Sequence, residues 1–309
     1  MESTYLFLTT VTIQSSMAVL FATLGEIVTE KSGILNLGVE GMMLMGAMSS
    51  FAASLYFKNP WLGVTCGLIT GAFFALIHAF FTIGLKANQV ICGLSLTIFG
   101  MGLSSFLGRF LIGKTGTRFL IWHVPILNKI PLVGPILFNQ TPLVYLSYIF
   151  VPLIWVLLYK TNIGLSLRAV GENPTAADVT GISVVRYRYL ATIFGGMMAG
   201  LGGSYLSLFY TPGWKENMTA GQGWIAIAMV IFSTWNPFRA VIGSLMFGGI
   251  NALQYYFQAS GITIIPNYIL MMLPYIFTLV VLFLINQTEG AKRKLGAPAS
   301  LGVAFEREL

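Results

Sequence analysis

The chain carries very little charge for its length. Only 9% of its 309 residues are Asp, Glu, Lys or Arg, whereas a soluble globular protein carries about 25%. Asp178 is the single aspartate, and His78 and His123 are the only histidines. This scarcity excludes a well-hydrated surface, and it leaves no paired-aspartate, metal-ligand or Ser–His–Asp arrangement for catalysis. We therefore expect the chain to lie in membrane lipid and to have no catalytic site of its own.

Clustered basic charge and cysteine pairs are missing as well. The net charge of +7 is distributed between apolar runs rather than gathered in one patch, which argues against a nucleic-acid partner. Cys66 and Cys92 are the only cysteines. The topology below places them near opposite membrane faces, so we expect two separate thiols and no disulfide.

Long apolar runs dominate what is present. Hydrophobic residues make up 56% of the chain, and its mean hydropathy is +0.80. The sequence therefore predicts an all-α integral membrane protein, a polytopic bundle of about nine (8–10) helices of about 20 residues each. The candidate spans are Leu6–Leu24, Ile34–Phe57, Trp61–Leu85, Val90–Ile112, Leu143–Tyr159, Tyr189–Tyr210, the short run Gly221–Trp235, Phe238–Phe257 and Tyr268–Ile285.

The basic residues between these runs predict the orientation. Cytoplasmic loops carry an excess of Lys and Arg. When the polar segment Leu165–Arg188 is placed inside, strict alternation of the spans brings the larger basic set inside with it. This predicts an outer N-terminus and an inner C-terminus. The inner set is Lys31, Lys86, Lys160, Arg168, Arg186, Arg188, Arg239 and 292–294, and the outer set is Lys58, Lys114, Arg118, Lys129 and Lys215.

The segment Leu165–Arg188 is polar and lies between membrane-length runs. Asn173 can cap a helix that begins at Pro174, because proline has no N–H to lose at the first helical position. Gly181 can end that helix in a left-handed conformation. A short capped helix on a loop of a membrane protein is typical of a surface that a cytosolic partner contacts.

Glu40 is the charge that stands out inside a predicted span. A carboxylate in hydrocarbon normally faces a cavity or a partner group. Two interpretations stay open: Glu40 lines a polar path together with Asn36, or its hydrogen bonds fix the start of a broken helix. The residues favour the structural interpretation. We find no second acid deep in another span, which argues against proton coupling.

Several amides lie near the ends or in the interiors of the predicted spans. Hydrogen bonding between helices is their usual role. Together with Asn36 and Glu40 they are also candidates for lining a weak path for a hydroxylated solute. These amides are Asn88, Gln89, Gln222, Asn251 and Gln254.

Glycines recur at a spacing of four in two spans. Gly63, Gly67 and Gly71 lie in the third span, and Gly196 and Gly200 lie in the sixth. This spacing lets helix backbones approach closely. We expect packing within the chain, with a subunit interface as the alternative.

Residues 108–115, GRFLIGKT, match the spacing of a phosphate-binding P-loop. A P-loop needs a buried strand before it and a helix N-terminus after it. Here an apolar helical run comes first, so we expect no nucleotide site.

Four stretches resemble one family. They are GEIVTEKSGILNLGVEGMMLMGA (Gly25–Ala47), ANQVICGLSLTIFGMGLSSFLG (Ala87–Gly108), the segment Gln140–Val184, and WKENMTAGQGWIAIA (Trp214–Ala228). The chain is similar over nearly its whole length to permease subunits of bacterial ABC importers in the ribose/branched-chain amino acid class. It most resembles the shorter permease of nucleoside or simple-sugar systems.

The resemblance implies a location in the bacterial cytoplasmic membrane and three partners. A second homologous permease would complete a heterodimer, and an extracytoplasmic substrate-binding (lipo)protein would deliver the solute. A cytosolic ATPase with two nucleotide-binding domains would hold ATP and Mg²⁺, so that this chain binds no cofactor. The coupling helix seated on that ATPase would use Arg168, Gly171, Glu172, Asn173, Pro174, Ala176, Ala177 and Asp178.

The implied function is ATP-driven import of a small polar solute, foremost a nucleoside. A permease for a simple sugar such as ribose or galactose is the alternative, and an ion-coupled secondary transporter is a further one. Residues 1–285 would form the transmembrane domain, with the coupling loop at 161–188. Residues 286–309 would form a loosely ordered cytoplasmic tail.

Overall fold

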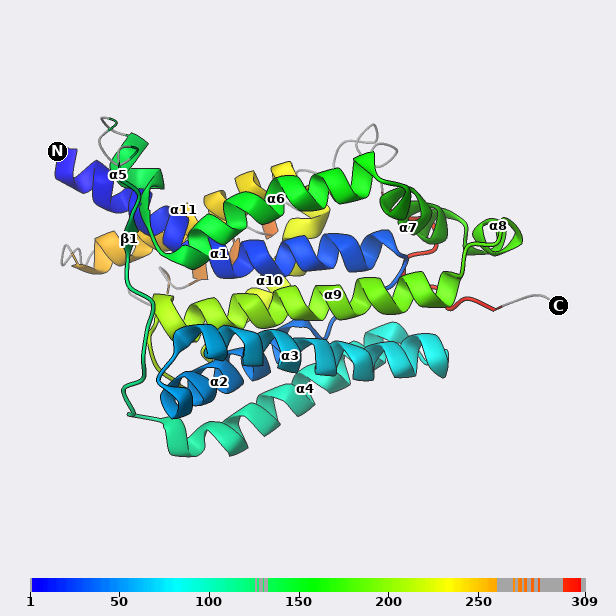
Figure 1. Cartoon of the computed structure of the whole chain (residues 1–309), viewed down its shortest axis with the longest axis horizontal. Helices are drawn as coiled ribbons and strands as arrows, with labels where there is room; N and C mark the ends of the chain where they lie inside the picture. Colours follow the sequence, from blue (N-terminus) through cyan, green and yellow to red (C-terminus); the bar gives the residue numbers. More distant parts are fainter. Residues whose placement is uncertain are drawn as a thin grey trace.

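Long helices run side by side along the longest axis of the molecule (Figure 1). The computed structural model describes residues 2–125, 127, 130, 133–259 and 297–306, together with single positions between 269 and 283. The only strands within these residues are two short ones, β1 and β2, so the predicted all-α class is confirmed.

The first part of the chain forms four long helices. They are α1 (Glu2–Lys31), α2 (Val39–Phe57), α3 (Pro60–Ala79) with a π-helical continuation η1 (Phe80–Gly84), and α4 (Gln89–Gly108) with a 3₁₀ turn η2 (Arg109–Leu111). The antiparallel ribbon of β1 (Trp122–His123) and β2 (Asn139–Gln140) follows, with the short helix α5 (Val133–Leu137) between its strands.

The second part contains both long and short helices. They are α6 (Pro142–Lys160), α7 (Asn162–Glu172), α8 (Pro174–Val179), α9 (Val184–Tyr205) with a π-helical continuation η4 (Leu206–Tyr210), α10 (Gln222–Phe232) and α11 (Pro237–Ala259). Four of the helices described here begin at proline, which fits the first helical position because no intrahelical N–H bond is needed there.

The centre of the bundle is α9, which packs against α1, α2 and α3. Gly67 and Gly71 of α3 face Gly200 and Gly196 of α9, whereas Gly63 faces the backbone of Ser50 in α2. A Cβ atom on Gly71 would lie 2.1 Å from the carbonyl oxygen of Gly196, and one on Gly200 would lie 2.2 Å from that of Gly67. Only glycine permits this approach of the backbones, and the prediction of packing within the chain is confirmed.

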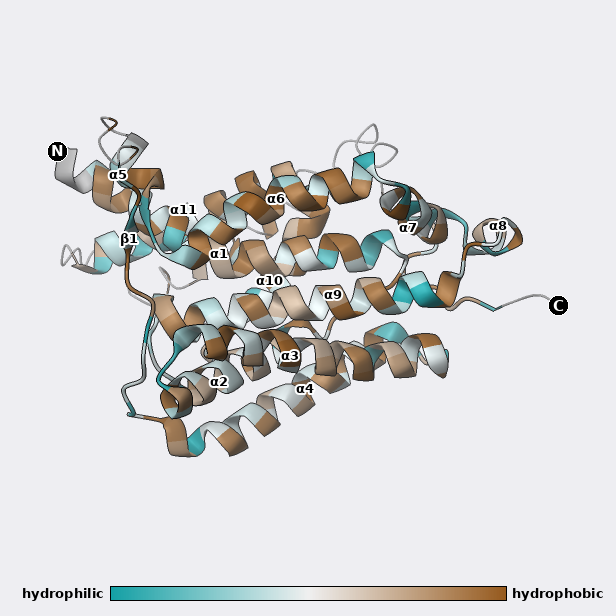
Figure 2. Cartoon of the chain, viewed as in Figure 1, coloured by the Kyte–Doolittle hydropathy of each residue, from teal (hydrophilic) through white to brown (hydrophobic). Residues whose placement is uncertain are grey.

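Among the residues that the structure describes, four helical stretches are long and apolar enough to cross a membrane: Tyr5–Lys31, Pro60–Gly84, Gln89–Leu111 and Pro142–Lys160. Helices α2 and α9 have 19 and 22 residues, but most of those residues are buried against other helices. Protein rather than lipid surrounds them, so their sequences need not be strongly apolar. Figure 2 shows hydrophilic residues gathered toward both ends of the bundle.

The predicted spans differ from the helices at several places. The run from Ile34 begins with a loop, since α2 starts only at Val39, and α1 extends seven residues beyond Leu24, to Lys31. Helix α10 has 11 residues, about 16 Å, or half of the hydrocarbon thickness. The predicted span Tyr268–Ile285 lies outside the described residues except for isolated helical positions.

The structure also bears on three smaller expectations. The P-loop match begins at the end of α4 and has no strand before it. Cys66 and Cys92 are free thiols. The expectation of a loose tail is wrong for residues 297–306, where hydrogen bonds hold the backbone and Ser300 against α7, α9 and the loop between α1 and α2.

Candidate functional site

The hairpin of α7 and α8 stands at one end of the bundle, opposite the end that carries β1 and α5 (Figure 1). The side chain of Thr161 caps α7 by accepting a hydrogen bond from the backbone N–H of Gly164 at 3.1 Å. Asn173 caps α8 in the same way, accepting from the N–H of Ala176 at 3.0 Å. Gly181, with a φ of +85°, follows α8. The predicted helix from Pro174 to Val179 is confirmed.

The hairpin presents a mixed surface at its tip. Glu172, Asn173 and Ala176 are exposed, and Pro174 and Asp178 are half-buried. Ala177 instead points inward and packs with Val170 and Val184 in a small apolar cluster. Val179 is 84% exposed, and the sequence offered no signal that singled it out.

Arg168 lies on the inner side of α7. Its guanidinium group lies 5.2 Å from the ring centroid of Tyr159, a cation–π arrangement. Beside it is a hollow of about 370 Å³, which we name the α7 socket. It is lined by Lys31, Leu165, Arg168, Ala169, Glu172 and Pro298.

Gly171 brings α7 directly against the end of α1. A Cβ atom at this position would lie 2.2 Å from the backbone oxygen of Lys31. A backbone oxygen cannot swing away as a flexible side chain can, so only glycine fits. The hairpin is thereby seated on the helix that leads into the loop between α1 and α2.

That loop, residues 32–38, is largely buried although it has no regular structure of its own. Buried backbone N–H and C=O groups need partners, and side chains from three helices supply several of them. The N–H of Leu35 donates to Gln89 Oε1 at 2.7 Å, and its carbonyl pairs with His78 Nε2 at 3.2 Å. Thr97 donates to the carbonyl of Leu37, and Arg188 donates to that of Ser32. The loop therefore links α3, α4 and α9.

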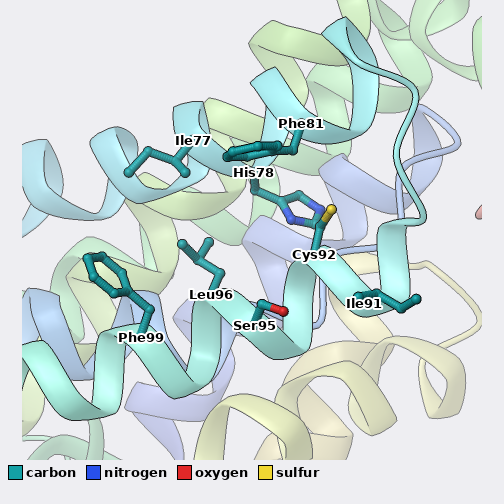
Figure 3. Close-up of a pocket in the computed structure, with 8 residues that line it drawn as sticks. All are labelled: Ile77, His78, Phe81, Ile91, Cys92, Ser95, Leu96 and Phe99. Atoms are coloured by element: carbon teal, nitrogen blue, oxygen red, sulfur yellow. The ribbon is translucent and has the colours of Figure 1, made fainter.

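A cavity of about 370 Å³ adjoins this linkage between α3 and α4. Figure 3 shows the ring of His78 directed from α3 toward α4, beside Cys92. Apolar side chains form most of the remaining wall, including Leu96 and Phe99. Within the described ranges, no three His, Cys, Asp or Glu side chains come together in a way that could hold a metal ion.

Two buried acids on α1 escaped the search of the sequence for acids inside the spans. Glu26 and Glu30 are buried near the end of α1. Asn36 donates to Glu26 Oε1 at 3.0 Å, and the indole N–H of Trp235 donates to Glu30 Oε2 at 2.7 Å. The prediction missed both acids because it ended the first span at Leu24. Their four-residue spacing just beyond an apolar run was the available signal.

Glu40 is buried at the start of α2 and reaches the start of α10. Its carboxylate accepts hydrogen bonds from the hydroxyl of Thr219 and from the backbone N–H groups of Gly221 and Gly223. Gln222, the first residue of α10, lies between those two glycines. The carboxylate thus satisfies N–H groups that a helix N-terminus leaves without intrahelical partners.

The other candidate path residues lie in separate places. Asn88 is exposed and caps α4 by accepting from the N–H of Ile91 at 3.1 Å. Asn36 and Gln89 hold the loop 32–38. Asn251 and Gln254 lie on α11, which packs against α1.

Comparison with known proteins assigns the family. Residues 7–285 match the family described as "Branched-chain amino acid transport system / permease component". The chain is 39% identical, over 96% of its length and 97% of the relative, to "Putative glucose ABC transporter permease protein TsgC13" of Haloferax volcanii.

Two further relatives are named as permeases for nucleosides. The nucleoside ABC transporter permease protein NupC of Lactococcus lactis is 37% identical over 87% of this chain and 89% of its own. The guanosine ABC transporter permease protein NupQ of Bacillus subtilis is 31% identical over 95% of this chain and 94% of its own.

A solved ABC transporter in an inward-facing conformation shares the fold. Its TM-score is 0.50 at 13% identity, with 90% of this chain and 84% of that chain covered. The chain therefore belongs to the branched-chain amino acid transport system permease family, a family of ABC transporter permeases.

Proposed function

We propose that this permease imports nucleosides and that the α7–α8 hairpin couples it to a cytosolic ATPase. The observation that carries the proposal is the hairpin itself, which is capped at both helices and exposes Glu172, Asn173 and Val179 at one end of the bundle. A mixture of polar and apolar side chains on a capped, exposed tip is compatible with an interface between proteins.

Coupling then follows from how the hairpin is seated. Gly171 rests on the end of α1, and the loop 32–38 behind it is bonded to α3, α4 and α9. A displacement of α7 by the ATPase is passed to these helices as a rigid-body movement, because close-packed interfaces move between discrete arrangements rather than deform. The bundle would rock and open toward alternate faces.

A second, homologous permease is the partner we propose within the membrane. The chain is similar to both NupC and NupB of Lactococcus lactis, and to both TsgC13 and TsgB13 of Haloferax volcanii. Each pair comes from one organism, which supports a heterodimer. An extracytoplasmic binding protein would supply the solute, and ATP and Mg²⁺ would sit on the ATPase.

The names of NupC and NupQ support a nucleoside as the solute. The name of TsgC13 supports a second candidate, a simple sugar. The orientation we propose has the hairpin and residues 297–306 in the cytoplasm and the ribbon of β1 and β2 outside.

Uptake by the reconstituted complex tests the proposal. Proteoliposomes holding both permeases and the ATPase, supplied with binding protein, should take up labelled nucleoside only with ATP. Charge reversal of Glu172 and Asp178 together should abolish uptake while the protein stays in the membrane, and Glu216→Lys, an exposed residue far along the chain, should not. Uptake by the permease alone under an ion gradient would establish a secondary transporter instead, and exclusive uptake of glucose or ribose would establish the sugar.

A further inference from the structure

Residues 297–306, which we name the C-terminal strap, lie against the hairpin and the bundle at once. Ser300 is the point of contact with α7. Its backbone N–H and its hydroxyl both donate to the carbonyl oxygen of Gly171, at 3.0 and 2.7 Å. The strap therefore bonds to the same glycine that seats α7 on α1.

Arg188, at the start of α9, holds the other side of the strap. Only 2% of the residue is exposed. Its Nη1 donates to the carbonyl of Val303 at 3.1 Å and its Nη2 donates to the hydroxyl of Ser300 at 3.2 Å. Its Nε donates to the carbonyl of Ser32 at 3.2 Å. The orientation prediction counted Arg188 as one of several inner cations. In the structure its guanidinium group is buried and hydrogen-bonds the strap to the loop 32–38.

The hydrogen bonds between Arg188 and the strap offset the free-energy cost of burying the guanidinium group. A buried guanidinium group is costly unless its N–H groups are hydrogen-bonded. Two of the three acceptors of Arg188 belong to the strap. In addition, the N–H of Gly302 donates to the carbonyl of Gly33 at 3.1 Å. Removal of the strap would leave Arg188 and the loop 32–38 without these partners.

The strap also reaches the surface beside the hairpin. Pro298 forms part of the wall of the α7 socket, next to Arg168 and Glu172. Farther along, Lys86 and Glu306 form an ion pair at 3.3 Å between exposed side chains, and such a pair contributes little. The strap is therefore fixed chiefly by Ser300 and Arg188, and one edge of it belongs to the face that presents the hairpin.

We propose that the C-terminal strap is part of the coupling apparatus. Ser300 and Arg188 are positioning residues that join α7 to α9, so that a movement of the hairpin reaches the central helix. This inference rests on the proposed function, because it assigns a second connection between the same hairpin and the same bundle.

The test measures solute imported per ATP hydrolysed by the full complex in proteoliposomes. Ser300→Ala removes the hydroxyl that bridges Gly171 and Arg188, and we expect this ratio to fall about fivefold or more. Ser300→Thr keeps a hydroxyl and should restore the ratio. Val303→Ala is the matched control, since Val303 takes part through its backbone carbonyl and its side chain is 58% exposed.

A chain that ends at residue 296 lacks the whole strap, and its ratio of solute imported to ATP hydrolysed should fall at least as far as in Ser300→Ala. If that chain does not accumulate in the membrane, Ser300→Ala decides the question at equal amounts of folded complex. A normal ratio in Ser300→Ala, with normal ATP hydrolysis, would overturn the proposal. Lack of ATP-dependent uptake in the unaltered complex would instead overturn the proposed function, so the two failures are distinct.

Discussion

Glu40 Oε2 accepts a 2.7 Å hydrogen bond from the backbone N–H of Gly223, 183 residues farther along the chain. The two residues meet so closely that a Cβ atom on Gly223 would lie 2.6 Å from the backbone of Glu40. The start of α2 and the start of the half-length helix α10 are thus fixed to each other by one carboxylate. A short helix within a membrane protein gains a defined position in this way.

Glu40→Gln tests what that carboxylate does. A glutamine offers one acceptor oxygen and two N–H donors, so a buried N–H of α10 loses its acceptor, at a cost of about 1–3 kcal/mol. We expect a lower yield of folded protein and a lower midpoint of thermal unfolding, with solute selectivity unchanged. The exposed Glu216→Gln serves as the control. Altered selectivity at normal yield would show that Glu40 lines the path instead.

Gly71→Ala tests the contact between α3 and α9. The added Cβ would meet the carbonyl oxygen of Gly196 at 2.1 Å, and overpacking of this kind costs about 1–3 kcal/mol. The midpoint of thermal unfolding in detergent should fall. Gly102→Ala is the matched control, because nothing lies within 4 Å of a Cβ at that position in α4. Equal midpoints for the two variants would contradict the packing.

Asn173→Ala removes the cap of α8. The side chain accepts from the N–H of Ala176, and loss of such a cap costs about 1 kcal/mol. Because α8 has only six residues, its helix should loosen and nucleoside uptake per ATP should fall. Asn173→Asp keeps an acceptor at the same place and should transport normally. If both variants behave alike, the cap has no part in coupling.

Single cysteines test the orientation. In a background of Cys66→Ser and Cys92→Ser, an impermeant maleimide should label Asn173→Cys and Glu306→Cys only from the cytoplasmic side. Lys58→Cys and Lys215→Cys should react from outside. All four positions are exposed, so access to each depends on its side of the membrane. Labelling of Asn173→Cys on intact cells would reject the cytoplasmic placement of the hairpin.

Much of the helical framework could be predicted from apolar runs, since their length follows from the thickness of the bilayer. The second helix of the hairpin, α8, could be predicted as well, because Asn173, Pro174 and Gly181 act through local backbone chemistry. The end of the first span and the start of the second were harder to predict from the sequence. Glu26 and Glu30 look like the polar end of a span until Asn36 and Trp235 are seen to pair with them.

By itself the sequence determined that the chain is a bundle of apolar helices with one polar segment that holds a capped helix, because hydrophobicity and capping are properties of neighbouring residues. Only the tertiary structure decided that this helix pairs with α7 in a hairpin and how the hairpin is held. Contacts between Gly171 and Lys31, Ser300 and Gly171, and Arg188 and the strap join segments far apart in the chain. Such pairings depend on which backbone groups are left buried without partners, and that is settled only when all the helices have packed.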